Sequence, residues 1–398
     1  MQTIVLAAGQ GTRMRPLTEQ YPKPMLPVVG KPIAAHTVEA AVEAGASRIV
    51  LVVGYMEEVV RDYFGEEYAG VQIEYAVQTE QRGTADAVRA ADSKLDDAPF
   101  AVLNGDALYD GSSLTALFDE KPSVGSFRVD NPSQYGVLHT TDDETTATGV
   151  VEKPADPPSN LINAGAYVFP GEARSWLDVG ESERGEIELT DVLSRTCDEY
   201  EVSVVPFDRW LDIGRPWELL EANEWKLDAI ANDREGTVSE NAELNDLVFV
   251  HEDAEVRPGT VIDGPVYIDA GATVGPNAFV RGSTYIGPDA KVGNAVEVKN
   301  SVLMDGATVG HLSYVGDSVL GRDVNLGAGT KVANLRHDDE PVETPVKGEL
   351  TSTGRRKFGV VMGDRAKTGI NTSLNAGVKL PMEGTTKPGE TVLFDPES

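Results

Sequence analysis

The sequence predicts an α/β domain with an open, mixed and mostly parallel sheet, followed by a parallel β-helix. Three observations support this prediction. The chain has 398 residues, which favours two domains over one. Strand-like apolar runs alternate with helical patterns up to about residue 225, as in sheets covered by helices. From residue 262 onward, an apolar residue returns every six positions, a period that is typical of a β-helix.

The first half opens with an apolar strand, 3–8, that leads into a glycine-rich loop. We expect a helix over 32–44 and buried strands over 48–54 and 100–103. The last of these strands runs into Asn104-Gly105-Asp106. Ligands of open α/β sheets bind at the carboxyl ends of the strands, so both loops are candidates for a ligand site.

The loop after the first strand has the composition of a phosphate site. Gly9 and Gly11 allow backbone N–H groups to approach a ligand closely. Arg13, Arg15 and Lys23 add three cations. Neither a Walker loop nor a dinucleotide fingerprint fits, because the first ends in Gly-Lys-Ser/Thr and the second needs a third glycine.

Residues 9–27 resemble the signature of nucleoside-triphosphate:sugar-1-phosphate nucleotidyltransferases, with G-x-G-T-R-M followed by Pro-Lys-Pro-Met-Leu-Pro. The resemblance implies a Rossmann-like, GT-A-like domain in which Arg13 and Lys23 are catalytic. In such enzymes a sugar-1-phosphate oxygen attacks the α-phosphorus of a nucleoside triphosphate, and pyrophosphate leaves. By the same resemblance, the nucleotide-binding residues are Leu6, Ala7, Ala8, Gly9, Gly11, Thr12, Gln78, Gly83 and Thr84.

Two aspartates at strand ends are candidates for a magnesium site. Asp106 follows a buried strand, and Asp212 stands in Trp-Leu-Asp-Ile-Gly at the end of another. A hard cation that bridges phosphates needs carboxylate oxygens, and the resemblance makes these two aspartates its ligands. Taken singly, either aspartate could instead be a turn residue or a helix N-cap.

The sugar-phosphate site also follows from the resemblance. Glu152 would accept hydrogen bonds from sugar hydroxyls, and Lys153 would pair with the sugar phosphate. The alternative for these two residues is a solvated ion pair at a strand end. The full set that the resemblance implies is Asn104, Gly105, Gly136, Glu152, Lys153 and Asn163.

The second half repeats an apolar residue, often followed by glycine, every six positions. The period holds at Ile262, Ile268, Val274, Val280, Ile286, Val292 and Val298, and it resumes after one-residue slips at Val309, Val315, Leu320, Leu326 and Val332. Each turn of a β-helix stacks such a side chain on the previous one. The pattern resembles the left-handed hexapeptide β-helix, a triangular prism that implies a homotrimer or a multiple of it.

The segment 307–317 resembles the acetyltransferase motif of the bifunctional enzyme that makes UDP-N-acetylglucosamine. The resemblance makes His311 the general base toward the glucosamine nitrogen, with acetyl-CoA as co-substrate. The alternative for His311 is a corner residue of the β-helix that hydrogen-bonds to backbone. The same resemblance assigns sugar-phosphate binding to Arg281, Lys299, Tyr314, Asn325 and Asn334, and acetyl-CoA binding to Ala328.

The C-terminal region departs from the longer bacterial form of that enzyme. A charged insertion, 338–357, interrupts the coils, and only a few coils are expected after it, over 363–380. In this respect the chain more closely resembles the archaeal sugar-1-phosphate nucleotidyltransferase/acetyltransferases.

The sequence therefore predicts a nucleotidyltransferase domain over 1–228, a linker with first strands over 229–255, and an acetyltransferase-like β-helix over 256–398. The expected function is nucleotidyl transfer from UTP or dTTP to a sugar-1-phosphate, together with acetylation of glucosamine-1-phosphate. One alternative is a glucose-1-phosphate thymidylyl- or uridylyltransferase whose β-helix serves only assembly. Another is a non-catalytic regulatory subunit. The sequence leaves the base and the sugar open.

Charge and composition indicate where such an enzyme works. The net charge is −31, with 65 Asp and Glu against 34 Lys and Arg, which disfavours nucleic acid and anionic membranes as partners. No apolar run approaches the roughly 18 residues of a membrane span, so we expect a cytoplasmic protein. Cys197 is the only cysteine, which excludes an intramolecular disulfide. An acid-rich surface suits a halophilic host, because salt screens its self-repulsion.

The charge leads to a prediction about salt. At 0.01 M ionic strength the Debye length is about 30 Å, so the excess carboxylates repel one another across the molecule, whereas in molar salt it falls to about 3 Å. We expect the melting temperature to rise from 0.01 M to molar KCl. Differential scanning calorimetry over that range measures it, and a flat or falling melting temperature would contradict the adaptation to high salt.

Overall fold

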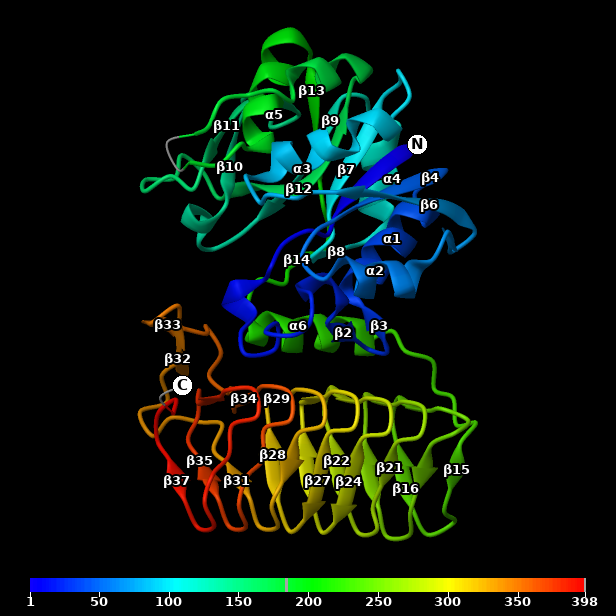
Figure 1. The fold of residues 1–398 in the computed structure, drawn as a ribbon, viewed down its shortest axis with the longest axis vertical. Helices are drawn as coiled ribbons and strands as arrows, with labels where there is room; N and C mark the ends of the chain where they lie inside the picture. Colours follow the sequence, from blue (N-terminus) through cyan, green and yellow to red (C-terminus); the bar gives the residue numbers. More distant parts are fainter. Residues whose placement is uncertain (183–184, 397–398) are drawn as a thin grey trace. The chain divides into compact units, whose positions relative to one another are not determined.

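The structure is a computed structural model that describes residues 1–182 and 185–396 (Figure 1). The chain folds into two compact units, and each takes up more than one segment of the sequence. The first unit comprises residues 1–10, 22–26 and 32–212, and the second comprises 11–21, 27–31 and 213–398. None of the described helices has both the length and the apolar composition needed to cross a bilayer.

The first unit is built on a sheet with the strand order β10-β11-β13-β9-β12-β7-β1-β4-β6-β5. Its strands are β1 Gln2–Leu6, β4 Arg48–Val53, β5 Glu67–Tyr68, β6 Val71–Val77, β7 Phe100–Asn104, β9 Ser123–Arg128, β10 Gly136–Thr140, β11 Thr146–Glu152, β12 Leu161–Phe169 and β13 Val202–Pro206. A separate two-stranded sheet pairs β8, Ala107–Tyr109, with β14, Trp210–Asp212.

The sheet is mixed, as expected, but it is parallel mainly in one half. β7, β1, β4 and β6 run parallel, and so do β9 and β13. β12 is antiparallel to both of its main neighbours, β7 and β9, and β10 pairs antiparallel with β11. The prediction of a mostly parallel sheet was therefore wrong for the half beyond β7. Short connections such as the one between β10 and β11 permit hairpins, which the buried apolar strands alone did not indicate.

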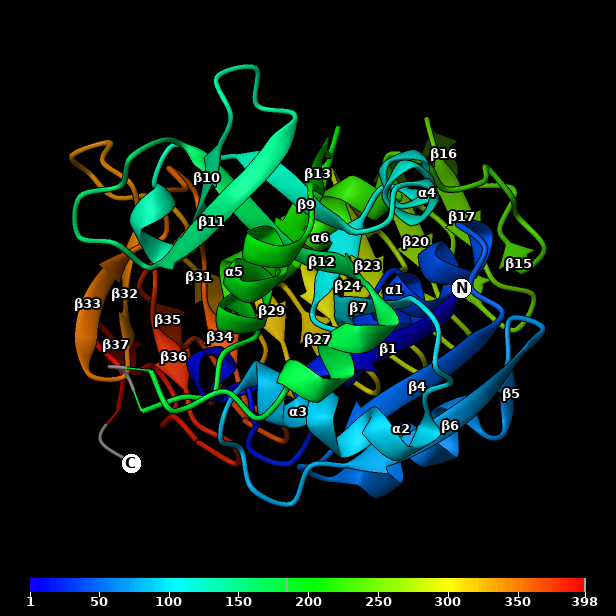
Figure 2. The same cartoon turned by 90° about the horizontal axis from the view of Figure 1, so that it is seen from above.

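Helices cover the first unit's sheet, whose central strands β1, β4, β7 and β12 are buried apolar runs. The expected helix over 32–44 is α1, Ile33–Glu43, and its small apolar residues are buried. The other helices of this unit are α2 Glu57–Phe64, α3 Thr84–Ala91, α4 Gly111–Asp119 and α5 Leu189–Glu199. Seen from above, α3 and α5 lie side by side (Figure 2), and they share a hydrophobic core with β1, β4, β7 and β12.

The second unit contains three parallel sheets that wind into a β-helix (Figure 1). The first sheet has β15 Thr237–Val238, β18 Glu255–Val256, β21 Thr273–Val274, β24 Lys291–Asn294, β27 Thr308–His311 and β30 Asn325–Leu326. The second has β16 Glu243–Asn245, β19 Val261–Asp263, β22 Phe279–Arg281, β25 Glu297–Lys299, β28 Tyr314–Gly316, β31 Lys331–Val332, β35 Ser373–Leu374 and β37 Thr391–Val392. The third has β17 Val248–Val250, β20 Val266–Ile268, β23 Thr284–Ile286, β26 Val302–Leu303, β29 Val319–Leu320, β34 Val361–Met362 and β36 Lys379–Leu380.

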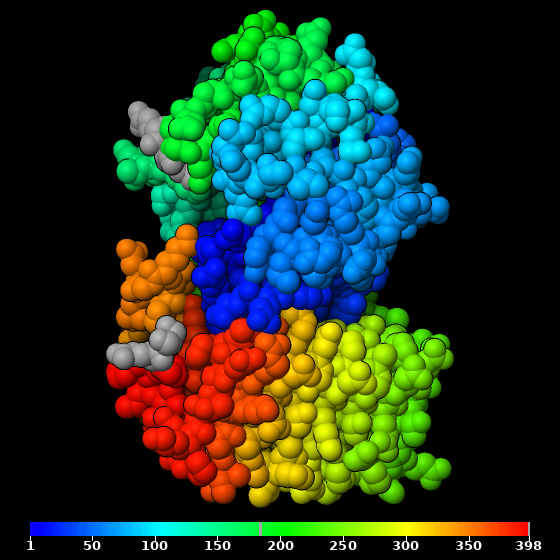
Figure 3. Space-filling view, viewed as in Figure 1, coloured from blue at the N-terminus to red at the C-terminus, as the bar shows by residue number. Residues whose placement is uncertain are grey.

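The apolar residues of the six-residue period form the interior of these coils. From Ile262 to Val298 all seven are fully buried, and those from Val309 to Val332 are at most 2% exposed. They belong to one continuous hydrophobic cluster that runs through the coils. In the space-filling view the coils follow one another as bands from yellow-green to red (Figure 3). The parallel β-helix is thus confirmed.

The charged insertion folds as an antiparallel hairpin of β32, Glu343–Val346, and β33, Glu349–Ser352. After it the coils continue further than residue 380, because β37 still stacks on β35. The sequence pattern missed this last coil, since Val392 follows a long polar stretch with few apolar residues. Helix α6, Pro216–Leu227, also belongs to this unit, where Trp217 packs edge-on against Phe358.

Two stacked glycines provide a test of the coil packing. A Cβ on Gly293 would lie 1.9 Å from the carbonyl oxygen of Gly310, whereas a Cβ on Gly310 would meet no atom within 4 Å. Overpacking against backbone costs about 1–3 kcal/mol. We expect Gly293→Ala to lower the melting temperature of the β-helix by several degrees in calorimetry. Gly310→Ala is the matched control and should leave it unchanged; equal effects of the two variants would argue against this stacking.

Candidate active sites

The loops that follow β1 and β7 lie next to each other in the first unit, because the two strands end side by side. The two strands pair in parallel, with Leu6 opposite Asn104. The backbone N–H of Gly105 donates to the carbonyl of Leu6 at 2.9 Å, and a Cβ on Gly105 would lie 2.6 Å from that oxygen. Only glycine fits this approach, which brings Ala7, Ala8 and Gly9 to the same edge of the sheet as Asp106.

Lys23, Asp106 and Asp212 are gathered by short local elements. Nζ of Lys23 lies 2.6 Å from a carboxylate oxygen of Asp106, and the Lys23 side chain is only 7% exposed. Asp106 directly precedes β8, and the pairing of β8 with β14 places Asp212 opposite Ala107. Two carboxylates at adjoining strand ends, beside a buried ammonium, are a donor set that suits a hard divalent cation.

Tyr109 holds the loop that carries Asp106 through hydrogen bonds of its hydroxyl. It is buried, and its hydroxyl donates to the carbonyl of Gly165 at 3.0 Å and accepts from the N–H of Asn104 at 3.1 Å. Burial, reinforced by the negative charge of Asp106, raises the pKa of Tyr109 well above its usual value. The phenol therefore remains protonated and holds the loop that carries Asp106.

Of the predicted nucleotide-binding residues, Gln78 lines a cavity of about 330 Å³. The other residues that line it are Gln10, Gly54, Tyr55, Glu57, Val77, Thr79 and Gln81. Nε2 of Gln81 donates to the carbonyl of Ala8 at 2.7 Å, so this side chain ties the loop after β6 to the end of β1. Gly83 and Thr84 begin α3, and Oγ1 of Thr84 accepts from the N–H of Leu189. Gln81 was not among the predicted residues, although it stands three positions after Gln78.

The predicted sugar-phosphate residues fall into two groups. Gly136 pairs with Glu152, and a Cβ on Gly136 would lie 2.9 Å from a Glu152 oxygen. Nζ of Lys153 lies 3.4 Å from Glu152. Asn163 is buried, donates to the Tyr167 hydroxyl at 2.6 Å and accepts from the N–H of Gly165.

Gly11, Thr12 and Arg13 belong to the second compact unit. Gly11 adopts a left-handed conformation, φ 62°, ahead of a 3₁₀ turn over Thr12–Met14, and its carbonyl accepts from Oγ1 of Thr18 at 2.8 Å. Arg13 is exposed, and its guanidinium lies beside Gly214, where an added Cβ would be 3.1 Å from Nη2.

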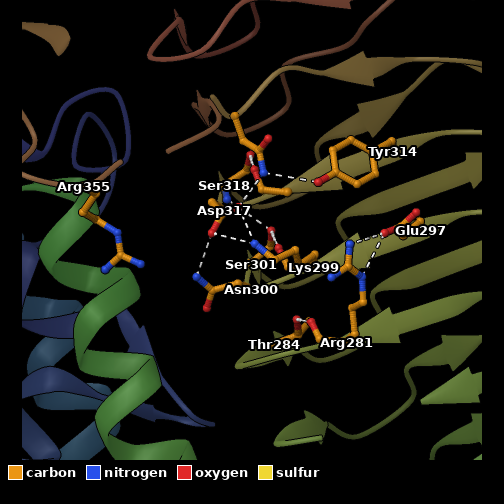
Figure 4. Close-up of polar contacts among 12 residues, drawn as sticks. Arg281, Thr284, Glu297, Lys299, Asn300, Ser301, Tyr314, Asp317, Ser318 and Arg355 are labelled. Atoms are coloured by element: carbon orange, nitrogen blue, oxygen red, sulfur yellow. Dashed lines mark hydrogen bonds and ion pairs between the residues drawn. The ribbon is translucent and has the colours of Figure 1, made fainter. Parts of the chain in front are cut away.

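The β-helix carries a second polar cluster, shown in Figure 4. Arg281 and Lys299 occupy the same register position on successive coils. Arg281 donates two bonds to one oxygen of Glu297, at 3.0 and 2.8 Å. Lys299 lies 3.1 Å from Asp317, whose side chain is only 3% exposed.

Asp317 is the centre of this cluster. It accepts from Asn300 at 2.9 Å and from Asn334 at 2.5 Å, besides Lys299. Asn334 also donates to the hydroxyl of Tyr314 at 3.2 Å. The structure thus brings together Lys299, Tyr314 and Asn334, three of the residues predicted from the motif. In the sequence, Asp317 is only the last residue of the motif. Its distance of 18 residues from Lys299, about one coil, is the signal that relates the two side chains.

Helix α6 and the insertion also reach this cluster. Glu224 accepts from Asn300 at 2.8 Å and forms an ion pair with Arg355, which follows the hairpin. No pattern in the sequence related these three residues, because they come from α6, a coil corner and the insertion. They connect the elements around Lys299 into one hydrogen-bonded network.

His311 ends β27 and is exposed. Its backbone carbonyl accepts from Ser313 Oγ at 2.8 Å and from the N–H of Gly329 at 2.9 Å, which fixes the corner that carries the ring. Asn325 lies exposed on the next strand of the same sheet. Ala328 follows in the turn of that coil, and its carbonyl accepts from the N–H of Asn371 on the coil after it.

Family models match both halves of the chain. Residues 2–228 match the nucleotidyl transferase family, and residues 262–388 match the C-terminal domain family named after GMPPB. In structure, the chain is similar to a UDP-glucose pyrophosphorylase solved with UDP-glucose, with a TM-score of 0.53 and 26% identity, covering 57% of this chain and 99% of that one.

Full-length relatives extend this similarity to the whole chain. A bifunctional sugar-1-phosphate nucleotidylyltransferase/acetyltransferase of Sulfurisphaera tokodaii is 37% identical, with 99% of this chain and 98% of the relative covered. The bifunctional protein GlmU of Methanocaldococcus jannaschii is 42% identical over 96% of this chain and 92% of its own length. A UTP–glucose-1-phosphate uridylyltransferase, AglF of Haloferax volcanii, is 38% identical over 56% of this chain and 96% of its own. With two domain matches and relatives of this identity over nearly its full length, the chain belongs to the family of bifunctional sugar-1-phosphate nucleotidylyltransferase/acetyltransferases.

Proposed function

We propose that this chain transfers a nucleotidyl group from UTP or dTTP to a sugar-1-phosphate and also acetylates glucosamine-1-phosphate, so that the joint product is UDP-N-acetylglucosamine. The observation that carries the first activity is the pairing of β8 with β14, which sets Asp212 opposite the residue after Asp106, beside Lys23. The names of the full-length relatives support the combination of both activities.

In nucleotidyl transfer, Lys23 and Arg13 neutralise the charge that develops on the departing pyrophosphate. Asp106 and Asp212 would hold Mg²⁺, which when bound shields the phosphates from one another and from the attacking oxygen. The loop residues Gly9, Gly11 and Thr12 present backbone N–H groups to the triphosphate. The nucleoside is bound by Leu6, Ala7, Ala8, Gln78, Gly83 and Thr84.

The sugar phosphate binds on the antiparallel half of the same sheet. Glu152 accepts from sugar hydroxyls and Lys153 pairs with the phosphate, while Gly136 leaves room beside Glu152. Asn163, Asn104 and Gly105 complete the binding surface. This orients the phosphate oxygen for attack on the α-phosphorus, and positioning of this kind accounts for most of the catalysis of phosphoryl transfer.

In acetyl transfer, His311 takes a proton from the glucosamine ammonium, and the free amine attacks the thioester carbon of acetyl-CoA. The carbon–sulfur bond breaks and CoA leaves as the thiol. Neutral imidazole is suited to this step near pH 7. The sugar phosphate is bound by Arg281 and Lys299. The sugar is bound by Tyr314, Asn325 and Asn334, and acetyl-CoA contacts Ala328.

Two alternatives are weaker. A plain glucose-1-phosphate uridylyl- or thymidylyltransferase would agree with the relative AglF, but that match covers only 56% of this chain. A non-catalytic subunit would have no need for the partly buried ion pair of Lys23 with Asp106. The buried Asp317, which gathers Lys299, Asn300 and Asn334, supports a ligand site in the β-helix over a role in assembly alone.

The proposal includes the organisation and setting of the enzyme. The nucleotidyltransferase domain spans 1–228, a linker with first strands follows over 229–255, and a left-handed β-helix spans 256–398. Such prisms associate as homotrimers or multiples of them. The enzyme works in the cytoplasm of a halophilic host, which the net charge of −31 supports.

Asp106→Asn tests the nucleotidyl-transfer site. Losing one charge at the phosphates should reduce pyrophosphate release roughly 10²-fold or more, the scale of a lost transition-state interaction. Acetyl transfer should remain normal in the same preparation. Asp119→Asn, at an exposed position at the end of α4, is the control and should keep full activity. Near-normal pyrophosphate release by Asp106→Asn at saturating Mg²⁺ would reject the assignment.

His311→Ala tests the acetyltransferase site. We expect CoA release from acetyl-CoA and glucosamine-1-phosphate to fall roughly 10²- to 10⁴-fold, the range for a lost general base. Pyrophosphate release should be unchanged, since the ring is exposed and carries little of the core. His139→Ala, another exposed histidine, is the control. If the wild type releases no CoA, the β-helix serves only as a scaffold. If His311→Ala is as active as the wild type, another residue is the base.

A further inference from the structure

The amide of Gln78 is held in one orientation by two acceptors. Gln78 follows β6 and is 7% exposed. Its Nε2 donates to the carbonyl of Gly83 at 3.0 Å and to Oδ2 of Asp86 at 3.0 Å. A carbonyl and a carboxylate can only accept hydrogen bonds. If the amide were reversed, its acceptor Oε1 would face two other acceptors, the Gly83 carbonyl and the Asp86 carboxylate. The hydrogen-bond network therefore assigns the amide nitrogen to the protein side.

Asp86 forms ion pairs with two arginines. It lies in the first turn of α3, and its side chain is 7% exposed. Arg82 lies 3.0 Å and Arg89 2.5 Å from its Oδ1. The other oxygen, Oδ2, is the one that Gln78 contacts, so the carboxylate joins the two guanidinium groups to the amide. A charge-assisted bond of this kind is stronger than one between neutral groups.

The other end of the amide has no donor from the protein. Within residues 1–182 and 185–396, no group donates to Oε1 of Gln78, and this atom is not among the buried atoms without a partner. Gln78 lines the cavity of about 330 Å³ described above. Gln78 therefore offers a ligand in this cavity its acceptor, Oε1. It offers no donor, because Nε2 is bonded to Gly83 and Asp86.

We propose that Asp86 is a specificity-determining residue for the nucleotide base, acting through Gln78. By fixing the amide, Asp86 makes Gln78 select a base that presents an N–H at its pairing edge, as uracil and thymine do with N3–H. Cytosine carries a lone pair on N3, and two acceptors would then face each other. Asp86 contacts no substrate and acts as a positioning residue. The inference rests on the proposed nucleotidyl-transfer site.

The test compares UTP with CTP, by calorimetric binding in Mg²⁺ and by kcat/KM from pyrophosphate release. The wild type should prefer UTP by about 10²-fold, the scale of rejection when a buried polar group is left unpaired. In Asp86→Asn the new side chain can also donate, so the amide can turn, and the preference should fall about tenfold. The KM for the sugar phosphate should not change.

A double-mutant cycle separates this role from a structural one. Gln78→Ala should abolish most of the preference, and adding Asp86→Asn to it should change the preference no further. Asp178→Asn is the matched control, because Asp178 also pairs with Arg89, at 3.1 Å, but is exposed and has no bond to Gln78. It should keep the wild-type preference.

Each outcome decides one claim. If Asp86→Asn weakens UTP and CTP alike, or if its effect on the preference persists in Gln78→Ala, Asp86 is only structural and the inference is wrong. Equal binding of UTP and CTP by the wild type also overturns it. If the wild type prefers UTP in binding but releases no pyrophosphate, the proposed function fails while the role of Asp86 stands.

Discussion

The close approach of the ends of β1 and β7 is the constraint on which the proposed nucleotide site depends. Parallel pairing of Leu6 with Asn104 brings two loops to one edge of the sheet, and the bond from Gly105 to the Leu6 carbonyl leaves no space for a side chain. The turn after Gly105 then directs Asp106 toward Lys23 and sends the chain into β8. A side chain at residue 105 would separate these loops, and with them the glycines and the carboxylates.

Charge is organised in the same way at both sites. In a chain with 65 acidic and 34 basic residues, a phosphate-binding cation placed without a partner would be drawn to many carboxylates. Lys23 is instead paired with Asp106, and Lys299 with the buried Asp317. Pairing of this kind holds a flexible ammonium in one place, which would lower the entropy lost when a phosphate binds. The pairs thus orient the cations before a ligand arrives.

Much of the fold could be predicted because it follows from local patterns. The six-residue period identified the β-helix, since each apolar residue from Ile262 to Val298 is buried in the coils. The antiparallel half of the first sheet could not be predicted in this way, because a buried strand such as β12 has the same apolar composition in either direction. The extra coil at Val392 was missed because a long polar stretch with few apolar residues separates it from the previous apolar positions.

The same distinction applies to the sites. Motifs pointed to Lys23 and its partner Asp106, and to Gln78, but not to Asp86, which holds the amide of Gln78. Asp86 stands eight residues after Gln78, and the two meet only because the chain turns at Gly83 into α3. Glu224 and Asn300 are 76 residues apart, and no spacing rule relates an α6 residue to a coil corner. The residues that we propose to contact a ligand thus stand in short motifs, whereas the residues that orient them depend on tertiary packing. In the proposed site, substrate choice depends on this second group, because a glutamine selects a base only after its amide has been fixed.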